Sequence, residues 1–543
     1  MPMPSPPGRL TERIADGAAV ATLAIVALLA ALTFRDYGLG WDDYTHSQYG
    51  ALLLDLYGSG FTDRRALSFV NLYAYGGGFD MAAALLAKVL PFGLFETRRL
   101  AGALVGLVGL GATWRLGRRV GGPLAGLLSL VLLATCPLYY GHMFINAKDG
   151  PFAAAMALLM LGLVRTFEDY PRVAPPTGAF LGIGIGLAIG SRILGGFAAI
   201  EALIVWLAIV AIDTRASGWR PALGRAGAFL LALLPALVLA YAVMALVWPW
   251  SVVAPLNPLR AVDYFSHFFE KPWRELFQGE FILVPEMPRR YVAQLFALKL
   301  PEIMLALGLC GAIGAFAAAF NRRLTAQRRA VLLLLALAAT FPIALTVALR
   351  PAMYNGIRHF VFVTPAIAAV AGLAAARLIE RARAWRPAAA AVGLALFAIG
   401  CALPAIEMAK LHPYEYTYFN RIEGGEREAR SRYMLDYWGL SLKQASEALL
   451  AWIAANHQAA PGREYWKIAV CGPHPPAQVA LGPHFDVVWD PGGADFAMSL
   501  GEFYCAQLDA PVVAEIKRDG VVYARVYDIR GRSFSTLLTL PAP

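Results

Sequence analysis

The sequence predicts a mainly α-helical bundle that crosses a membrane many times, followed by a small C-terminal α/β domain. Hydrophobic residues make up 58% of the 543 residues and charged residues only 15%, whereas soluble domains average about 45–50% and about 25%. Apolar runs approaching the length of a bilayer span, about 20 residues, recur as far as residue 403. We therefore expect a transmembrane domain in residues 1–403 and a soluble domain in residues 404–543.

About eleven apolar runs are candidate membrane spans. The first is expected to be an uncleaved helix, because no small-residue cleavage site separates it from the polar stretch that follows. The runs lie near residues 18–33, 99–114, 123–140, 152–164, 178–191, 195–212, 226–248, 303–320, 330–349, 360–379 and 388–403.

Arginines gather in short clusters between these runs and not in one stripe, which argues against nucleic-acid binding despite a formal charge of +10. Cytoplasmic loops are enriched in Lys and Arg, so we expect the N-terminus in the cytoplasm. With an odd number of spans, the C-terminal domain then faces outward. The clusters are Arg115, Arg118 and Arg119; Arg215, Arg220 and Arg225; Arg322, Arg323, Arg328 and Arg329; and Arg381, Arg383 and Arg386.

The C-terminal domain shows strand-like runs at residues 467–471, 486–489 and 521–527 and a helical pattern at residues 442–454. This mixture predicts a small α/β fold. Cys471 and Cys505 both lie in this domain. A disulfide can form between them if the domain is outside the cytoplasm, but the sequence alone does not establish the bond.

The first expected outer loop contains two adjacent carboxylates, Asp42 and Asp43, followed by His46. Charged groups at the membrane surface are costly unless they are solvated or paired. Repulsion between neighbouring carboxylates moves their pKa values apart, so one of them can stay ionised and act as a base. The alternative is that one aspartate only caps the helix that follows.

A second outer segment holds His142, Asn146, Lys148 and Asp149 within eight residues, directly before Pro151. Proline is common in the first turn of a helix, so Asp149 could be a simple helix cap. The segment nevertheless places charges at a hydrophobic–polar boundary, beside a helix N-terminus that can receive an anion. We therefore treat these four polar residues as candidate site residues.

Two further cations lie at the ends of apolar runs. Arg192 interrupts the apolar stretch from residue 178 to residue 210, and Glu201 is its nearest opposite charge in the sequence. Arg358 and His359 end an outer loop at the start of a helix. A guanidinium can bind a phosphate through two hydrogen bonds; the alternative for Arg358 is a side chain that merely reaches to the interface.

These features together resemble the GT-C glycosyltransferases, on the side of the protein O-mannosyltransferases and aminoarabinose transferases. An acidic pair opens the first outer loop, although Asp43 stands where the family usually has Glu. A second acid, Asp149, follows the third span, and a basic residue, Arg192, ends the fifth. The strings Gly141–Asp149, Ile357–Phe360 and Asp436–Gly439 also look like a bacterial branch of this group, and the resemblance covers nearly the whole chain.

The resemblance implies a donor in which the sugar is attached to a polyprenyl phosphate, and transfer with inversion to an acceptor hydroxyl on the periplasmic side of a bacterial inner membrane. Asp42 would be the base, with Asp43 and Asp149 orienting it or the acceptor. Lys148, Arg192 and Arg358 would neutralise the leaving phosphate. His46, His142, Asn146 and His359 are the remaining candidate substrate-binding residues.

The resemblance leaves several points open. Some GT-C enzymes bind a divalent metal through such carboxylates, so a divalent metal is a candidate cofactor. The acceptor is a lipid, glycan or protein that the sequence does not identify. A transporter or flippase is the alternative function, but transporters favour charges near the middle of the membrane and two related halves. Here the charges gather on one expected face, and the sequence has no two-fold repeat.

Overall fold

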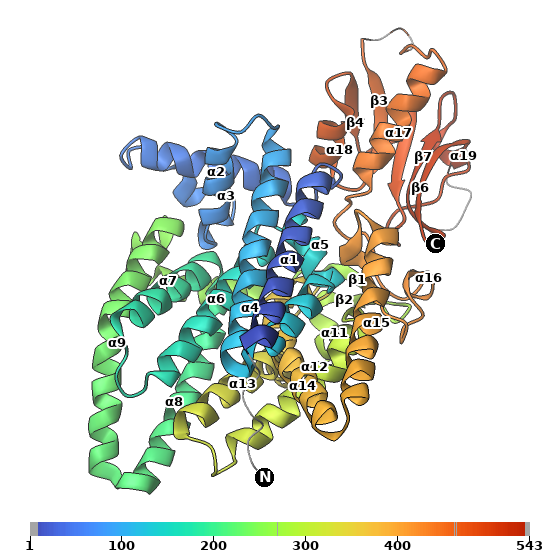
Figure 1. The fold of residues 1–543 in the computed structure, drawn as a ribbon. Coiled ribbons are helices and arrows are strands. Elements are labelled where there is room, and N and C mark those ends of the chain that lie inside the picture. Colours follow the sequence, from blue (N-terminus) through green and yellow to red (C-terminus); the bar gives the residue numbers. More distant parts are fainter. Residues whose placement is uncertain (1–8, 269, 461, 463, 538–543) are drawn as a thin grey trace.

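The computed structural model describes residues 9–268, 270–460, 462 and 464–537. It confirms the predicted fold class: a bundle of long helices carries a small sheet domain at one end, and the chain begins at the opposite end (Figure 1). The long helices are α1 (Arg9–Thr33), α4 (Leu94–Ala134), α6 (Asp149–Glu168), α7 (Pro175–Ser191), α8 (Gly196–Ser217), α9 (Trp219–Val247), α12 (Glu302–Ala319), α13 (Ala326–Leu349), α14 (Thr364–Trp385) and α15 (Pro387–Leu411).

Nine helices in the described part of the chain are long and apolar enough to cross a membrane. Helix α4 counts once among them although it contains two of the predicted runs, and α7 is apolar but shorter, with 17 residues. Each of the eleven predicted runs therefore lies on a helix of the bundle. The chain is a multi-pass membrane protein.

Helix α4 is a hairpin of two limbs. Gly122 has φ 85° and ψ 177° inside the helix, a conformation that is essentially restricted to glycine, and Pro123 follows it. The limbs then pack against each other, since a Cβ atom on Gly117 would lie 2.5 Å from the Ser129 hydroxyl. A single glycine thus turns the chain back into the bundle.

The centre of the bundle is formed by α14 and α6, whose apolar windows are 94% and 78% buried, whereas those of α9, α1 and α15 are at most 22% buried. Helix α14 packs closely along α4. At Gly372 a Cβ atom would lie 2.6 Å from the backbone nitrogen of Ser129, so only glycine allows this approach. The two helices at the centre lead directly to the loops that carry the charged residues.

The predicted arginine clusters gather at the end of the bundle where α1 begins. Arg118 binds Asp16 of α1 through two hydrogen bonds of 2.7 Å. Arg328 donates to the Val120 carbonyl, and Arg225 binds Asp213 at the end of α8. The charged loops expected on the outer side lie at the opposite end, so the two sets of charges are separated by the length of the bundle.

Short elements fill the end that carries the outer loops. The helices there are α2 (Asp43–Gly58), η1 (Arg65–Ser68), η2 (Leu72–Ala74), α3 (Gly78–Leu86), α5 (Pro137–Ile145), η3 (Ile193–Gly195), η4 (Pro249–Val252), α10 (Asn257–Phe268), η5 (Val284–Glu286), α11 (Tyr291–Lys299) and η6 (Arg358–Val363). A two-stranded antiparallel sheet, β1 (Arg274–Phe277) with β2 (Glu280–Leu283), lies among them.

The chain after α15 first packs against the bundle. This segment contains η7 (Glu415–Thr417) and α16 (Glu426–Ala429). The buried Lys299 ammonium lies 3.3 Å from each of three carbonyl oxygens, of Tyr416, Thr417 and Tyr418, and burial lowers the pKa of Lys299 to about 7. Asn420 donates to the carbonyls of Ala297 and Leu300. These bonds attach the C-terminal part of the chain to the membrane domain.

The sheet domain has five strands in the order β4-β3-β5-β7-β6. Strands β3 and β4 are parallel, as are β3 and β5, whereas β7 runs antiparallel to β5 and β6. The predicted strand and helix runs all correspond to elements of this domain. Its elements are α17 (Leu442–Ala455), β3 (Trp466–Cys471), α18 (His474–Leu481), β4 (Phe485–Val488), β5 (Phe496–Leu500), β6 (Val512–Arg518), β7 (Val521–Asp528) and α19 (Phe534–Leu537).

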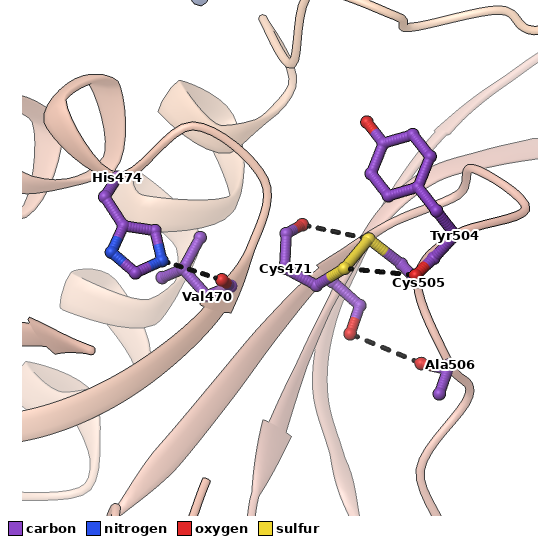
Figure 2. Close-up of a disulfide and its surroundings, with 7 residues drawn as sticks. Val470, Cys471, His474, Tyr504, Cys505 and Ala506 are labelled. Atoms are coloured by element: carbon purple, nitrogen blue, oxygen red, sulfur yellow. Dashed lines mark hydrogen bonds between the residues drawn. A yellow bond between two sulfur atoms is a disulfide. The ribbon is translucent and has the colours of Figure 1, made fainter. Parts of the chain in front are cut away.

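Cys471 and Cys505 form a disulfide (Figure 2). The bond joins the last residue of β3 to the loop that follows the neighbouring strand β5, and it closes a loop of 34 residues. The sequence had left this pairing open. Disulfides persist in oxidising compartments, so the bond agrees with an outward-facing domain.

The hairpin in α4 gives a first prediction. Replacing Gly122 by Ala places a Cβ atom in a glycine-only conformation, although no atom lies within 4 Å of it, so the cost comes from the backbone alone. We expect Gly122→Ala to lower the free energy of unfolding by about 1–3 kcal/mol, measured as a lower melting temperature in detergent. Gly111→Ala, in open space within the same helix, should melt like the wild type; equal melting of the two variants contradicts this account.

Candidate active site

The two adjacent aspartates of the first outer loop point in different directions. Asp43 is buried, and its carboxylate accepts two hydrogen bonds from Arg99, of 2.9 and 2.6 Å, and one from the Gly40 N–H. Asp42 keeps 39% of its side chain exposed and lies 3.0 Å from the Lys148 ammonium. Asp42 occupies the N-cap position of α2 but its side chain makes no capping bond. The exposed carboxylate of the pair is therefore Asp42.

In the second outer segment, the side chain of Asn146 performs the capping. Its Oδ1 accepts from the backbone N–H groups of Lys148 and Asp149 at the start of α6. The Asp149 carboxylate is therefore not needed as a cap. It receives the Asn146 amide at 2.7 Å and is paired with Arg192, although it follows α5 and Arg192 follows α7. Asp149, and not Glu201, is the partner of Arg192.

Arg358 joins the two acidic segments. Its Nη1 lies 4.0 Å from Oδ2 of Asp42 and 3.7 Å from Oδ2 of Asp149. The guanidinium is 5% exposed and lies 5.2 Å from the Trp438 ring centroid and 5.4 Å from that of Tyr354. Aromatic faces attract cations, so Arg358 is held at the junction of the two carboxylates.

These groups line one cavity of about 210 Å³. The structure brings six of the predicted site residues to its wall: Asp42, His46, Lys148, Arg192, Arg358 and His359. A further four wall residues are aromatic: Tyr75, Phe268, Trp273 and Tyr354. The rings of Tyr75 and Tyr354 contact the cations directly. The site is thus a cationic hollow with aromatic walls and one exposed carboxylate.

The charges around Asp42 control its ionisation. Burial on its own would raise the pKa of Asp42, but the nearby cations Lys148 and Arg358 outweigh it and lower the pKa below its usual value. Asp42 is therefore a carboxylate throughout the physiological pH range. An ionised, exposed carboxylate can accept a proton from a hydroxyl held beside it.

His46 lies at the rim of the cavity in a buried chain of three groups. Its Nδ1 is 2.6 Å from Asp80, whose other oxygen accepts from Arg98 at 2.6 Å. The second ring nitrogen, Nε2, is buried and has no hydrogen-bond partner among the residues that the structure describes. His46 also lines a small pocket shared with Asp42, Asn146 and Lys148, so Asp80 and Arg98 fix the orientation of the imidazole next to the candidate base.

His142 lies behind the cavity wall and not on it. It is fully buried between the rings of Tyr416 and Trp438, and the Tyr437 hydroxyl lies 3.3 Å from its Nε2. Burial lowers the pKa of His142 well below its usual value, so the ring is neutral. Its Nδ1 contacts the amide of Asn146, which makes His142 a support for the capping residue.

The sequence reasoning missed two contributors to the site. Trp438, from the segment after α15, covers the pocket of Asp42 and contacts Arg358. Glu275 of β1 is buried and accepts the N–H groups of Asn355 and Gly356, both with positive φ. It thereby fixes the loop that delivers Arg358. Trp438 lies in the string Asp436–Gly439 that resembles the bacterial branch, and Glu275 lies two residues after the wall residue Trp273, but neither position carries a sequence pattern that predicts these contacts.

The residues of the site do not fit a divalent metal. Each carboxylate is already paired with a cation: Asp42 with Lys148, Asp43 with Arg99, and Asp149 with Arg192. In the part of the chain that the structure describes, no group of three or more His, Cys, Asp or Glu side chains is placed to hold a metal ion. The arrangement is instead suited to an anionic ligand.

The buried pair gives a second prediction. Asp43→Ala leaves the Arg99 guanidinium buried without its carboxylate, which costs about 3–5 kcal/mol, so we expect a marked fall in melting temperature in detergent. Asp55→Ala, on the same helix, removes the exposed partner of Arg65 and should cost less than about 1 kcal/mol. If both variants melt alike, the Asp43–Arg99 pair does not support this loop.

Comparisons with known proteins agree with this architecture. Residues 79–250, about a third of the chain, match the family described as dolichyl-phosphate-mannose-protein mannosyltransferase. This region runs from α3 to η4 and contains Arg99, Asp149 and Arg192. A search of curated protein sequences gives no match.

Solved structures of similar fold cover most of the chain. ArnT from Cupriavidus metallidurans in the apo state has a TM-score of 0.50 at 15% identity, over 94% of this chain and 97% of ArnT. ArnT bound to undecaprenyl phosphate has a TM-score of 0.47 at 14% identity, over 95% and 98%. The oligosaccharyltransferase AglB from Archaeoglobus fulgidus, in complex with an inhibitory peptide and a dolichol-phosphate, has a TM-score of 0.48 at 14% identity, over 89% and 69%. The chain has an ArnT-like GT-C fold.

Proposed function

We propose that the protein transfers a sugar from a polyprenyl-phosphate donor to an acceptor hydroxyl. The observation that carries this proposal is the meeting of Asp42, Lys148, Arg192 and Arg358 around one cavity. The family match in residues 79–250 and the ArnT-like fold support the same class of reaction.

The charges of the cavity suit a donor with one phosphate. Lys148, Arg192 and Arg358 are three cations facing the two carboxylates Asp42 and Asp149, which leaves an excess of one positive charge. Hydrogen-bond donors and cations of the protein that are already in position before the reaction stabilise the charge that develops on a leaving group. The excess charge therefore favours departure of a polyprenyl phosphate, whose chain stays in the bilayer.

Asp42 is the proposed base because its carboxylate is the exposed one. The side chains of Asp43 and Asp149 are only 3% and 1% exposed, and both are held by arginines. In the reaction, Asp42 takes the proton of the acceptor hydroxyl and the acceptor oxygen bonds to the anomeric carbon. The bond from that carbon to the phosphate oxygen breaks, the phosphate leaves with the electron pair, and the configuration inverts.

Binding of the sugar donor also changes the pKa of the proposed base, Asp42. A bound phosphate shares Lys148 and Arg358 with Asp42, and weaker pairing raises the pKa of Asp42 towards its ordinary value. A base is most effective when its pKa approaches the working pH. Donor binding thus prepares Asp42 for proton transfer. Asp149 holds Arg192, and Asp43 fixes the loop of Asp42 through Arg99. His46 and His359 line the cavity, and His142 and Asn146 support the start of α6.

We place the reaction on the periplasmic side of a bacterial inner membrane, with the N-terminus in the cytoplasm. The separation of the arginine clusters from the cavity supports this orientation, as does the disulfide in the sheet domain. The concentration of charge at one end of the bundle favours this enzyme over a transporter, whose charges gather at mid-membrane.

Asp42→Asn tests the proposed base. The amide keeps the shape but accepts no proton, and we expect transfer to fall by at least about 100-fold. The measurement follows radiolabelled sugar leaving polyprenyl-phosphate lipids extracted from metabolically labelled bacterial membranes, with purified protein in detergent. Asp55→Asn, on the exposed side of α2, is the matched control and should keep wild-type activity. Wild-type transfer by Asp42→Asn removes Asp42 as the base.

Lys148→Gln tests the electrostatic control of that base. Without the ammonium the pKa of Asp42 rises, so the carboxylate is lost at a higher pH on acidification. We therefore expect the acid limb of the kcat/KM profile to move to higher pH in the same assay. Lys88→Gln, which makes the same charge change elsewhere in the first outer loop, should leave the limb in place. An unmoved limb in Lys148→Gln contradicts the pairing.

A further inference from the structure

A second basic cavity, a groove lined by arginines, lies at the opposite end of the bundle. It has a volume of about 440 Å³ and lies between the first limb of α4, α6 and α7. Four arginines line it: Arg115, Arg118, Arg119 and Arg165. Arg115 lies sixteen residues after Arg99 on the same helix, which corresponds to about 24 Å. This groove is therefore separate from the candidate active site.

Two of the four arginines already have carboxylate partners. Arg118 is paired with Asp16, and Arg119 with Glu168. Arg115 and Arg165 make no ion pair with the residues that the structure describes. An arginine cluster that only fixed the orientation of the protein would have no need of a walled space around it. The groove thus carries an uncompensated charge of about two.

The guanidinium of Arg165 is oriented by an aromatic ring and keeps an N–H group available for a ligand. This guanidinium lies 5.4 Å from the Phe180 ring centroid, and its buried Nε has no hydrogen-bond partner in the described part of the chain. The Arg115 guanidinium lies 5.8 Å from the ring of Trp114. Rings orient these groups without using their N–H donors, and an unsatisfied buried donor costs free energy until a ligand accepts from it.

The rest of the groove is apolar. Gly111, Ala112, Leu158 and Leu161 line it one to two turns further into the bundle, and a Cβ atom on Gly111 would meet nothing within 4 Å. A basic end continued by an apolar floor matches a molecule with a phosphate head and a hydrocarbon tail. Basic pockets between membrane helices bind the head groups of anionic lipids.

We propose that this groove binds an anionic phospholipid, with its phosphate between Arg115 and Arg165 and an acyl chain along Gly111 and Leu158. The excess charge favours cardiolipin, which has two phosphates, over a lipid with one. The site is separate from the transferase chemistry and does not depend on it. Its function is to anchor and stabilise the α4–α6–α7 side of the bundle in the leaflet where the arginine clusters lie.

Native mass spectrometry of the full-length protein tests the proposal, with cardiolipin, phosphatidylglycerol and phosphatidylcholine added to delipidated protein. We expect cardiolipin to bind best and phosphatidylcholine least. Arg115→Gln/Arg165→Gln should weaken cardiolipin binding about 30-fold, since each basic residue near an anionic lipid contributes about a factor of five. Arg322→Gln/Arg323→Gln, an equal charge change in an exposed loop outside the groove, should leave binding unchanged. If both double variants lose the same amount of cardiolipin binding, the proposed site is wrong.

Gly111→Leu separates a lipid from a free anion. The larger side chain fills the apolar floor and changes no charge, so it should weaken cardiolipin binding at least about tenfold and leave any effect of inorganic phosphate unchanged. Competition by millimolar inorganic phosphate, together with unchanged cardiolipin binding in Gly111→Leu, overturns the proposal in favour of a site for free phosphate. Melting temperatures of all variants identify any that do not fold.

Discussion

The position of Arg358 between Asp42 and Asp149 is the constraint on which the rest of the site depends. Charges beside a membrane are costly unless they are paired or solvated. One guanidinium, held against Trp438 and Tyr354, lies within 4.0 Å of both carboxylates. Because the two aspartates come from separate loops, Arg358 also fixes those loops relative to each other. The same contacts of Arg358 therefore determine both the electrostatics of the site and the packing of the outer loops.

Behind this contact lies a layer of fully buried pairs. Asp43 with Arg99, and Asp80 with Arg98 and His46, connect the first outer loop to the start of α4. Such pairs contribute little net stability, but removing one partner is strongly destabilising. They act as a scaffold that leaves Asp42 as the exposed carboxylate of the pair. The catalytic proposal follows from this difference between two adjacent aspartates: Asp43 is buried in an ion pair, and Asp42 is exposed to the cavity.

The segment after α15 and the aromatic loop before α11 complete the cavity from the other side. Trp438 covers the pocket of Asp42, and Glu275 holds the loop of Arg358 through its backbone N–H groups. The C-terminal part of the chain is attached to the membrane domain through the bonds of Lys299 and Asn420. A groove with a different set of arginines lies at the opposite end, so the two proposals together give the bundle an anion-binding surface at each end.

The sequence by itself determined the helical bundle, the approximate spans, the strands of the C-terminal domain and the charged residues that gather in the cavity. Those features follow from apolar length, periodicity and the cost of charge near lipid, which are local properties. Only the tertiary structure decided which aspartate is exposed, that Asn146 caps α6 in place of Asp149, and that Arg192 pairs with Asp149 and not with Glu201. It also brought Trp438 and Glu275 to the site, because pairings between distant segments depend on how the loops pack and leave no periodic signal in the chain.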